Sequence, residues 1–119
     1  MKWYLVKLVY QIICGDGSHT PQFDEQLRII RAEDDLHAFQ KARRVGEKEQ
    51  DSFLNAVQKP VKWKFIDVTE MNVLNEFVDC AEMYSRIKEE DDAEIFIQLV
   101  KLRASHLLQN SMHKAIYLN

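Results

Sequence analysis

The first hydrophobic run of the chain has no polar face. From Trp3 to Cys14 the residues are mostly β-branched or aromatic, and only Lys7 and Gln11 interrupt them. This composition predicts a long β-strand. Because both faces of the run are apolar, the pattern favours a central strand that is covered on both sides.

The second run alternates between apolar and polar residues. In residues 22–32, Phe23, Leu27 and Ile29 fall on one face, whereas the other face is polar. This alternation predicts a half-solvated strand that pairs with the first strand as a hairpin. An amphipathic helix follows, and Asp34 is its expected N-cap. The apolar stripe of this helix consists of Leu36, Ala38, Phe39, Ala42 and Val45.

The second half of the chain repeats this order. Residues 61–68 alternate and predict a third strand, which follows an expected loop over residues 52–59. A fourth strand is expected over residues 76–87, joined to the third by an irregular link over residues 71–75.

The last apolar pattern has helical spacing. It predicts a helix over residues 91–109, which Asn110 and Ser111 are expected to break, leaving residues 110–119 as a short tail. Its apolar face is wider than one sheet contact requires. We expect either that the tail covers this surplus or that the helix and tail lie at an interface, most simply that of a two-fold homodimer.

The expected element order is therefore β-β-α-β-β-α, which belongs to the α+β class. An antiparallel sheet of about four strands with helices packed on one face satisfies this order. The length of 119 residues predicts a single domain, residues 1–119.

Charge and cysteine content restrict the function classes. The net charge of −3 lacks the positive potential that general nucleic-acid binding needs, so we expect no nucleic-acid partner. No run approaches the roughly 18 apolar residues of a membrane span, so no membrane partner is expected. The two cysteines, Cys14 and Cys80, fit a reducing compartment, and we expect a cytoplasmic protein.

The segment from Cys14 to Glu25 carries most of the candidate chemistry. Turn formation explains its glycines, but it does not require His19 or the neighbouring acids. A carboxylate beside His19 would orient the imidazole for acid–base work, whereas the alternative is a turn histidine without chemistry. With no nucleophile or oxyanion motif nearby, we expect no catalytic site here. The candidates are His19 and Glu25 for catalysis, and Asp16, His19, Asp24 and Glu82 for ligand binding.

A zinc site is the second hypothesis for this segment. Cys14, Asp16 and His19 could supply three ligands, with Cys80 or His37 as the fourth. Because their spacing matches no zinc signature, we expect inert thiols, no metal and no cofactor.

Two further patterns have structural explanations. Lys59, Lys62 and Lys64 interleave with aromatic residues, as in single-strand nucleic-acid binders, but alternation places them opposite Trp63 and Phe65. We therefore expect the aromatic side chains to enter the core. Glu82, expected on a strand, is interpreted as one half of a structural ion pair.

Several segments together resemble a known bacterial family. They are Trp3-Tyr4, the helix entry Glu33 to Ala38 with its continuation to Lys41-Ala42, the strand Val61 to Val68, and Ala81 to Ser85. Over roughly residues 1–88, the chain resembles the family known as domain of unknown function 4288. Cys80-Ala81 stands where a glycine is expected. The resemblance supports the fold and implies no activity, cofactor or catalytic residue.

Two functions of different classes follow. The preferred one is a non-enzymatic binding or structural module, homodimeric, of the adaptor, regulatory or toxin-neutralising type. The alternative is a small-molecule-binding protein or enzyme with a pocket at the Cys14–Glu25 loop that uses His19 and Glu25.

Overall fold

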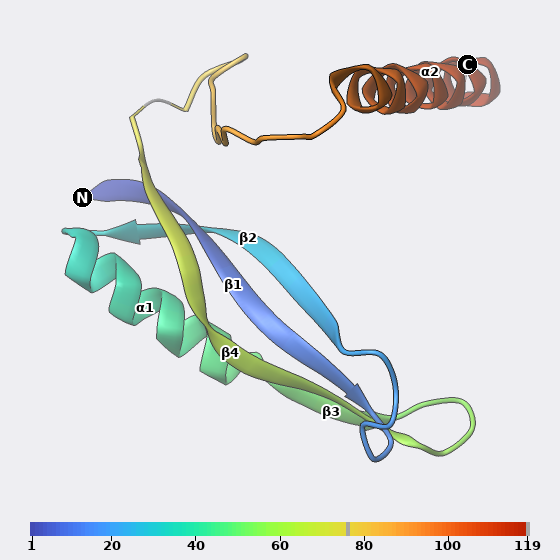
Figure 1. Cartoon of the computed structure of the whole chain (residues 1–119). Helices are drawn as coiled ribbons and strands as arrows, with labels where there is room; N and C mark the ends of the chain where they lie inside the picture. Colours follow the sequence, from blue (N-terminus) through green and yellow to red (C-terminus); the bar gives the residue numbers. More distant parts are fainter. Residues whose placement is uncertain (76, 119) are drawn as a thin grey trace. The chain divides into compact units, whose positions relative to one another are not determined.

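A computed structural model gives the fold and describes residues 1–75 and 77–118. The chain forms two compact units, Met1–Ser85 and Arg86–Asn119 (Figure 1). The elements in chain order are β1 (Lys2–Cys14), β2 (Gln22–Ala32), α1 (Asp35–Lys48), β3 (Asp51–Leu54), β4 (Pro60–Leu74) and α2 (Ala93–Leu118). This order is the predicted β-β-α-β-β-α, and the α+β class is confirmed.

The first unit is built on one antiparallel sheet with strand order β2-β1-β4-β3. β1 is central, as its two apolar faces predicted, and β2 is its hairpin partner. The β1–β2 register is regular along the whole pair, from Lys2 opposite Ala32 to Ile12 opposite Gln22. The β1–β4 register shifts twice, between Lys7 and Leu8 and between Val9 and Tyr10.

The strand predicted over residues 61–68 is confirmed as part of β4, but the strand predicted over residues 76–87 was placed wrongly. β4 runs without a break through residues 71–74, where an irregular link was expected, and β3 lies inside the expected loop over 52–59. Residues 77–87 contain no strand, and Glu76 lies outside the described residues. The physical reason is that β1 has only two edges. β2 fills one edge, and β4 pairs along the whole of the other from Trp3 to Cys14, which draws residues 71–74 into the strand. Residues 77–85 instead contact the sheet through the side chains of Phe77 and Tyr84.

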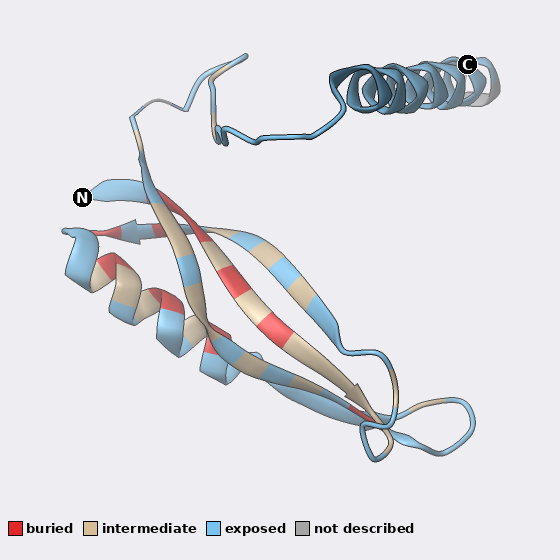
Figure 2. Cartoon of the chain, viewed as in Figure 1, coloured by how far each residue is buried: buried red, intermediate tan, exposed pale blue. Residues whose placement is uncertain are grey.

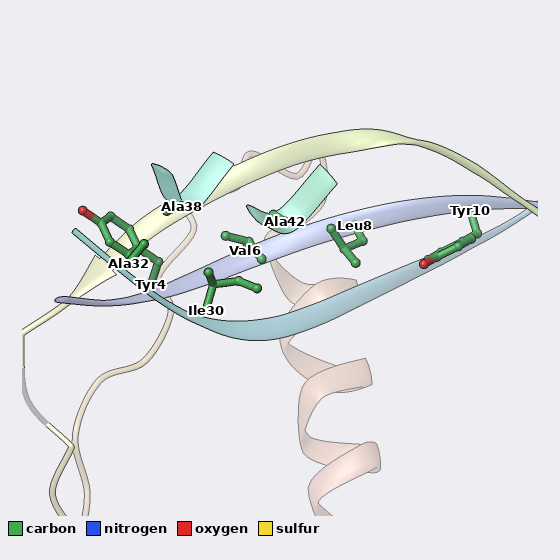
Figure 3. Close-up of a cluster of buried hydrophobic side chains, with 8 residues drawn as sticks. All are labelled: Tyr4, Val6, Leu8, Tyr10, Ile30, Ala32, Ala38 and Ala42. Atoms are coloured by element: carbon green, nitrogen blue, oxygen red, sulfur yellow. The ribbon is translucent and has the colours of Figure 1, made fainter. Parts of the chain in front are cut away.

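Helix α1 packs on one face of the sheet (Figures 1 and 2). Figure 3 shows the core between them, formed by alternate side chains of β1 together with residues of β2 and α1. Its buried members are Tyr4, Val6, Leu8, Tyr10, Ile30, Ala32, Ala38 and Ala42. Because alanines face the sheet, the helix backbone approaches β1 and β4 closely.

The helix begins as predicted, but its inner face differs from the prediction. The Asp34 side chain accepts a hydrogen bond from the backbone N–H of His37 at 2.8 Å, which caps the helix. Leu36, expected in the core, is 65% exposed. Phe39 is half-buried beneath the guanidinium of Arg43. The buried helix positions are Ala38, Ala42 and Gly46.

The face of β2 that points toward α1 is also the opposite of the one its pattern indicated. Pairing with β1 places Asp24, Gln26 and Arg28 on the same face as Tyr4 and Tyr10, which is the face α1 covers. The apolar side chains Phe23, Leu27 and Ile29 therefore lie on the open face of the sheet.

The second unit consists of the segment after Ser85 and α2. Asp92 accepts a hydrogen bond from the backbone N–H of Ile95 at 3.1 Å and starts the helix. The predicted break at Asn110-Ser111 is absent, because the Ser111 hydroxyl donates to the carbonyl of Leu107 at 2.7 Å and stays within the helix. The expected tail is thus helical to Leu118. The side chains of Tyr117 and Leu118 and all of Asn119 lie outside the described residues.

Candidate functional site

Two glycines and one histidine determine the conformation of the loop between β1 and β2. Gly15 and Gly17 have φ values of +59° and +85°, in the left-handed region that glycine adopts without strain. Nε2 of His19 accepts a hydrogen bond from the backbone N–H of Cys14 at 2.9 Å. Its Nδ1 therefore carries the proton and donates to the carbonyl of Thr20 at 2.8 Å. Both ring nitrogens are used inside the loop.

Asp16 is bound in the same way to its own loop. The backbone N–H of Ser18 donates to its carboxylate at 2.9 Å, and this bond lowers the pKa of Asp16 below its ordinary value of 3.8. The loop also closes on β4, because the N–H of Gly15 donates to the carbonyl of Pro60 at 2.7 Å. The polar groups of this loop thus form hydrogen bonds with one another, as in an ordinary turn.

An open hollow of about 630 Å³ lies beside this loop. Its walls are formed by residues on both sides of the β1–β4 pair: Cys14, Gly15, Asp16, Ser18, His19, Lys59 and Pro60. Lys59 and His19 are its basic groups, and Asp16 is its acid. The hollow can admit a small molecule, but neither His19 nitrogen is free to coordinate or bond to it without a change in the loop.

The other predicted site residues do not gather with His19. Asp24 accepts hydrogen bonds from Nε1 of Trp63 at 3.2 Å and from Gln26 at 2.6 Å, on the face covered by α1. Glu25 pairs with Val9 on the open face. Since successive residues of a strand point to opposite faces, Asp24 and Glu25 cannot serve one site.

Glu82 lies outside the sheet, in the segment of residues 77–85 that we name the strap. The strap is irregular, and Cys80 within it has φ 68°. Glu82 is exposed and lines a hollow of about 460 Å³ between the strap and the end of β4. Its predicted position on a strand is therefore wrong, and across residues 1–75 and 77–118 its carboxylate forms no ion pair.

The zinc hypothesis finds no cluster in the described part of the chain. Among residues 1–75 and 77–118, no three His, Cys, Asp or Glu side chains are placed so that they could hold a metal ion. The aromatic residues of β4 follow the prediction: Trp63 and Phe65 pack against the core, while Lys62 and Lys64 are exposed.

Sequence reasoning missed a polar cluster on the open face. Nζ of Lys7 lies 3.4 Å from Glu70 and 5.7 Å from the ring centre of Tyr84, whose hydroxyl donates to Glu70 at 3.1 Å. Only 12% of the Lys7 side chain is exposed. Phe77 also contacts Trp3, with ring centres 6.0 Å apart. The strap is therefore anchored on the sheet at two points. The feature of the sequence that could have indicated this cluster is Lys7, a charged residue inside an otherwise apolar strand.

The remainder of the open face is apolar and accessible. Phe23, Leu27 and Ile29 of β2 are 56%, 51% and 48% exposed. Glu25 and Arg31 lie on the same face, on either side of Leu27 and Ile29. We name these five residues of β2 the open strip. Helix α2, described by itself, likewise exposes every side chain from residue 93 to residue 116.

The described part of the chain thus forms a small α+β domain. Its most extensive candidate binding feature is exposed apolar surface rather than a cluster of reactive groups. The family described as domain of unknown function 4288 matches residues 3–85, and the chain belongs to that family. The match ends at Ser85, where the first compact unit also ends. No curated protein and no solved structure matches the chain. No helix among the described residues is long and apolar enough to cross a membrane.

Proposed function

We propose that this protein is a non-enzymatic binding module that associates with itself through apolar surface. The observation that carries the proposal is the orientation of β2. Phe23, Leu27 and Ile29 point away from α1 and are about half exposed, while Asp24, Gln26 and Arg28 point to the helix-covered face. Exposed apolar patches are often interaction sites, which supports this proposal.

The composition of α2 supports the same proposal. Its first two turns carry Ile95, Phe96, Ile97, Leu99 and Val100, all exposed. A helix gains most of its stability from packing an apolar face rather than from intrinsic propensity. An apolar surface this wide is therefore a second candidate for contact with a protein.

The alternative is a small-molecule-binding protein or enzyme at the Cys14–Glu25 loop. The hollow beside the loop is the observation in its favour. Against it stand the engagement of both His19 nitrogens and the position of Glu25 on the open face of β2. For these reasons the binding module is the preferred function.

Absolute mass in solution tests the proposal. Light scattering on purified, untagged protein across micromolar concentrations is expected to show a mass that rises from that of the 14.1 kDa chain toward twice that value. A mass that stays at 14.1 kDa over the whole range would contradict self-association.

Ligand-induced thermal stabilisation tests the alternative. A ligand that binds the folded state raises Tm in proportion to the logarithm of its excess over Kd. We expect a broad panel of small molecules and metal ions to leave Tm unchanged. A shift that His19→Ala abolishes, while Ser85→Ala on the strap leaves it intact, would favour the pocket at the loop instead.

Within the binding class, we propose a cytoplasmic adaptor, regulatory or toxin-neutralising protein. The two free cysteines, Cys14 and Cys80, support an intracellular location. Fractionation of native cells checks this part of the proposal, and recovery of the protein in a membrane or secreted fraction would contradict it.

A further inference from the structure

Within the open strip, two opposite charges lie on either side of Leu27 and Ile29. Along β2, Glu25 lies two residues before Leu27, and Arg31 lies two residues after Ile29. All four side chains share the face that α1 does not cover. Among the described residues, neither Glu25 nor Arg31 forms an ion pair, although the guanidinium of Arg31 lies 5.5 Å from the ring centre of Trp3.

This charge pattern is complementary to itself in one orientation only. If two copies lay their open strips together with the strands antiparallel, a two-fold axis near Arg28 would place Glu25 of one copy against Arg31 of the other, and Leu27 against Ile29. With the strands parallel, Glu25 would face Glu25 and Arg31 would face Arg31. Like charges in register destabilise a pairing, whereas opposite charges specify orientation.

We propose that the partner of the open strip is a second copy of this chain, packed face to face and antiparallel, with two reciprocal Glu25–Arg31 ion pairs. A two-fold interface uses the same patch on both subunits, and Glu25, Leu27, Ile29 and Arg31 meet that requirement. This inference rests on the proposed self-association and specifies its surface and its orientation.

The edge of β2 is a less suitable contact than its face. Strand-to-strand pairing would leave the apolar side chains of the open strip in water. It would also bring the charged side chains of Asp24 and Arg28 to the junction between the two strands. Charged residues commonly protect edge strands from such pairing. Face-to-face packing covers Leu27 and Ile29 instead.

The anchored strap limits the size of this interface. Tyr84 and Phe77 already cover the open face at Lys7 and Trp3, so the free surface is mainly that of β2. Residues 25–31 span about 23 Å at roughly 3.3 Å per residue, and a strip about 10 Å wide gives roughly 230 Å². Stable complexes bury about 800 Å² per partner. We therefore expect a weak dimer whose population depends on protein concentration.

A charge-swap cycle on the full chain tests the orientation. Glu25→Arg places like charges together at both ends of the dimer, and so does Arg31→Glu. Each single variant is expected to raise the dimer Kd about ten-fold, because two attractive pairs become repulsive. The double variant E25R/R31E restores opposite charges and is expected to return within about three-fold of the original Kd.

Matched controls carry the same charge changes elsewhere on the exposed surface. Arg44→Glu on α1 and Glu89→Arg after the strap are expected to leave the dimer Kd within about two-fold. Circular dichroism of each variant verifies that it is folded. If the dimer Kd of the double variant is as high as that of the single variant with the higher Kd, the proposed orientation is wrong.

Methyl NMR locates the interface independently of any substitution. Across a concentration series of the original chain, the methyl signals of Leu27 and Ile29 are expected to shift, while those of Ile97 and Leu107 in α2 remain constant. Dimerisation accompanied by shifts only in α2 would overturn this inference and leave the proposed self-association intact. A monomer at every concentration would overturn both.

Discussion

Gly46 of α1 lies directly against the ring of Phe65 on β4. A methyl group at Gly46 would fall far inside van der Waals contact with Cε1 of Phe65. The ring is itself confined by Tyr10, whose ring centre lies 5.5 Å away. The hydroxyl of Tyr10 donates to the carbonyl of Gly46 at 2.9 Å. These three residues fix how closely the helix approaches the sheet.

Gly46→Ala is expected to lower the free energy of unfolding. Overpacking costs about 1–3 kcal/mol, against which the better helix propensity of alanine returns about 0.5–1 kcal/mol. A net loss of about 1–2 kcal/mol should be seen in denaturant unfolding. Phe65→Leu removes the clashing ring atoms, so G46A should be less harmful in that background. A G46A variant more stable than the original would refute the close packing.

Tyr10→Phe is expected to destabilise the protein by about 1–2 kcal/mol, because it leaves the buried Gly46 carbonyl without its donor. Chemical denaturation measures the loss. Tyr84→Phe is the matched control, since its hydroxyl bonds to Glu70 at the exposed strap and should cost less. Equal effects of the two substitutions would show that burial of the Tyr10 bond is unimportant.

Tyr84→Ala is expected to release the strap while leaving the sheet folded. Tyr84 contacts the sheet through Glu70 and Lys7, so its loss removes one of the two anchors of residues 77–85. Limited proteolysis should cut this segment faster, with Tm nearly unchanged. Ile87→Ala, at a fully exposed position after the strap, should not alter the cleavage rate. An unchanged rate in Tyr84→Ala would contradict the anchoring role.

The Arg43–Asp67 ion pair is expected to make stability depend on acid pH. Arg43 donates two hydrogen bonds of 3.0 Å to this carboxylate and holds the pKa of Asp67 below its ordinary value of 3.8. The contribution of the pair is therefore complete above the unfolded value and is lost as pH falls through the lower folded pKa. Thermal melts should show Asp67→Asn less stable than the original at pH 6, with the difference shrinking below pH 3.8. A difference that stays constant with pH would contradict this assignment.

Local patterns predicted the elements whose signals are strong and short in range. The apolar run of β1, the alternation of β2 and the Asp34 cap each depend on neighbouring residues, and all three lie where the sequence placed them. The aromatic residues of β4 also face the core as predicted. In the candidate site, the sequence indicated the loop at His19, but not that the loop would use both of its ring nitrogens.

Contacts between residues distant in the sequence determined the remaining features of the fold. Alternation alone determined that Phe23, Leu27 and Ile29 share a face, but the pairing of β2 with β1 decided that this face is the one opposite α1. Tertiary contacts also decided that residues 77–85 form a strap, because Phe77 contacts Trp3 and Tyr84 contacts Glu70 and Lys7 on the sheet. The reason is physical. Periodicity separates two faces of an element without saying which one a distant helix will cover, and hydrogen bonding between strands settles that only when the sheet assembles.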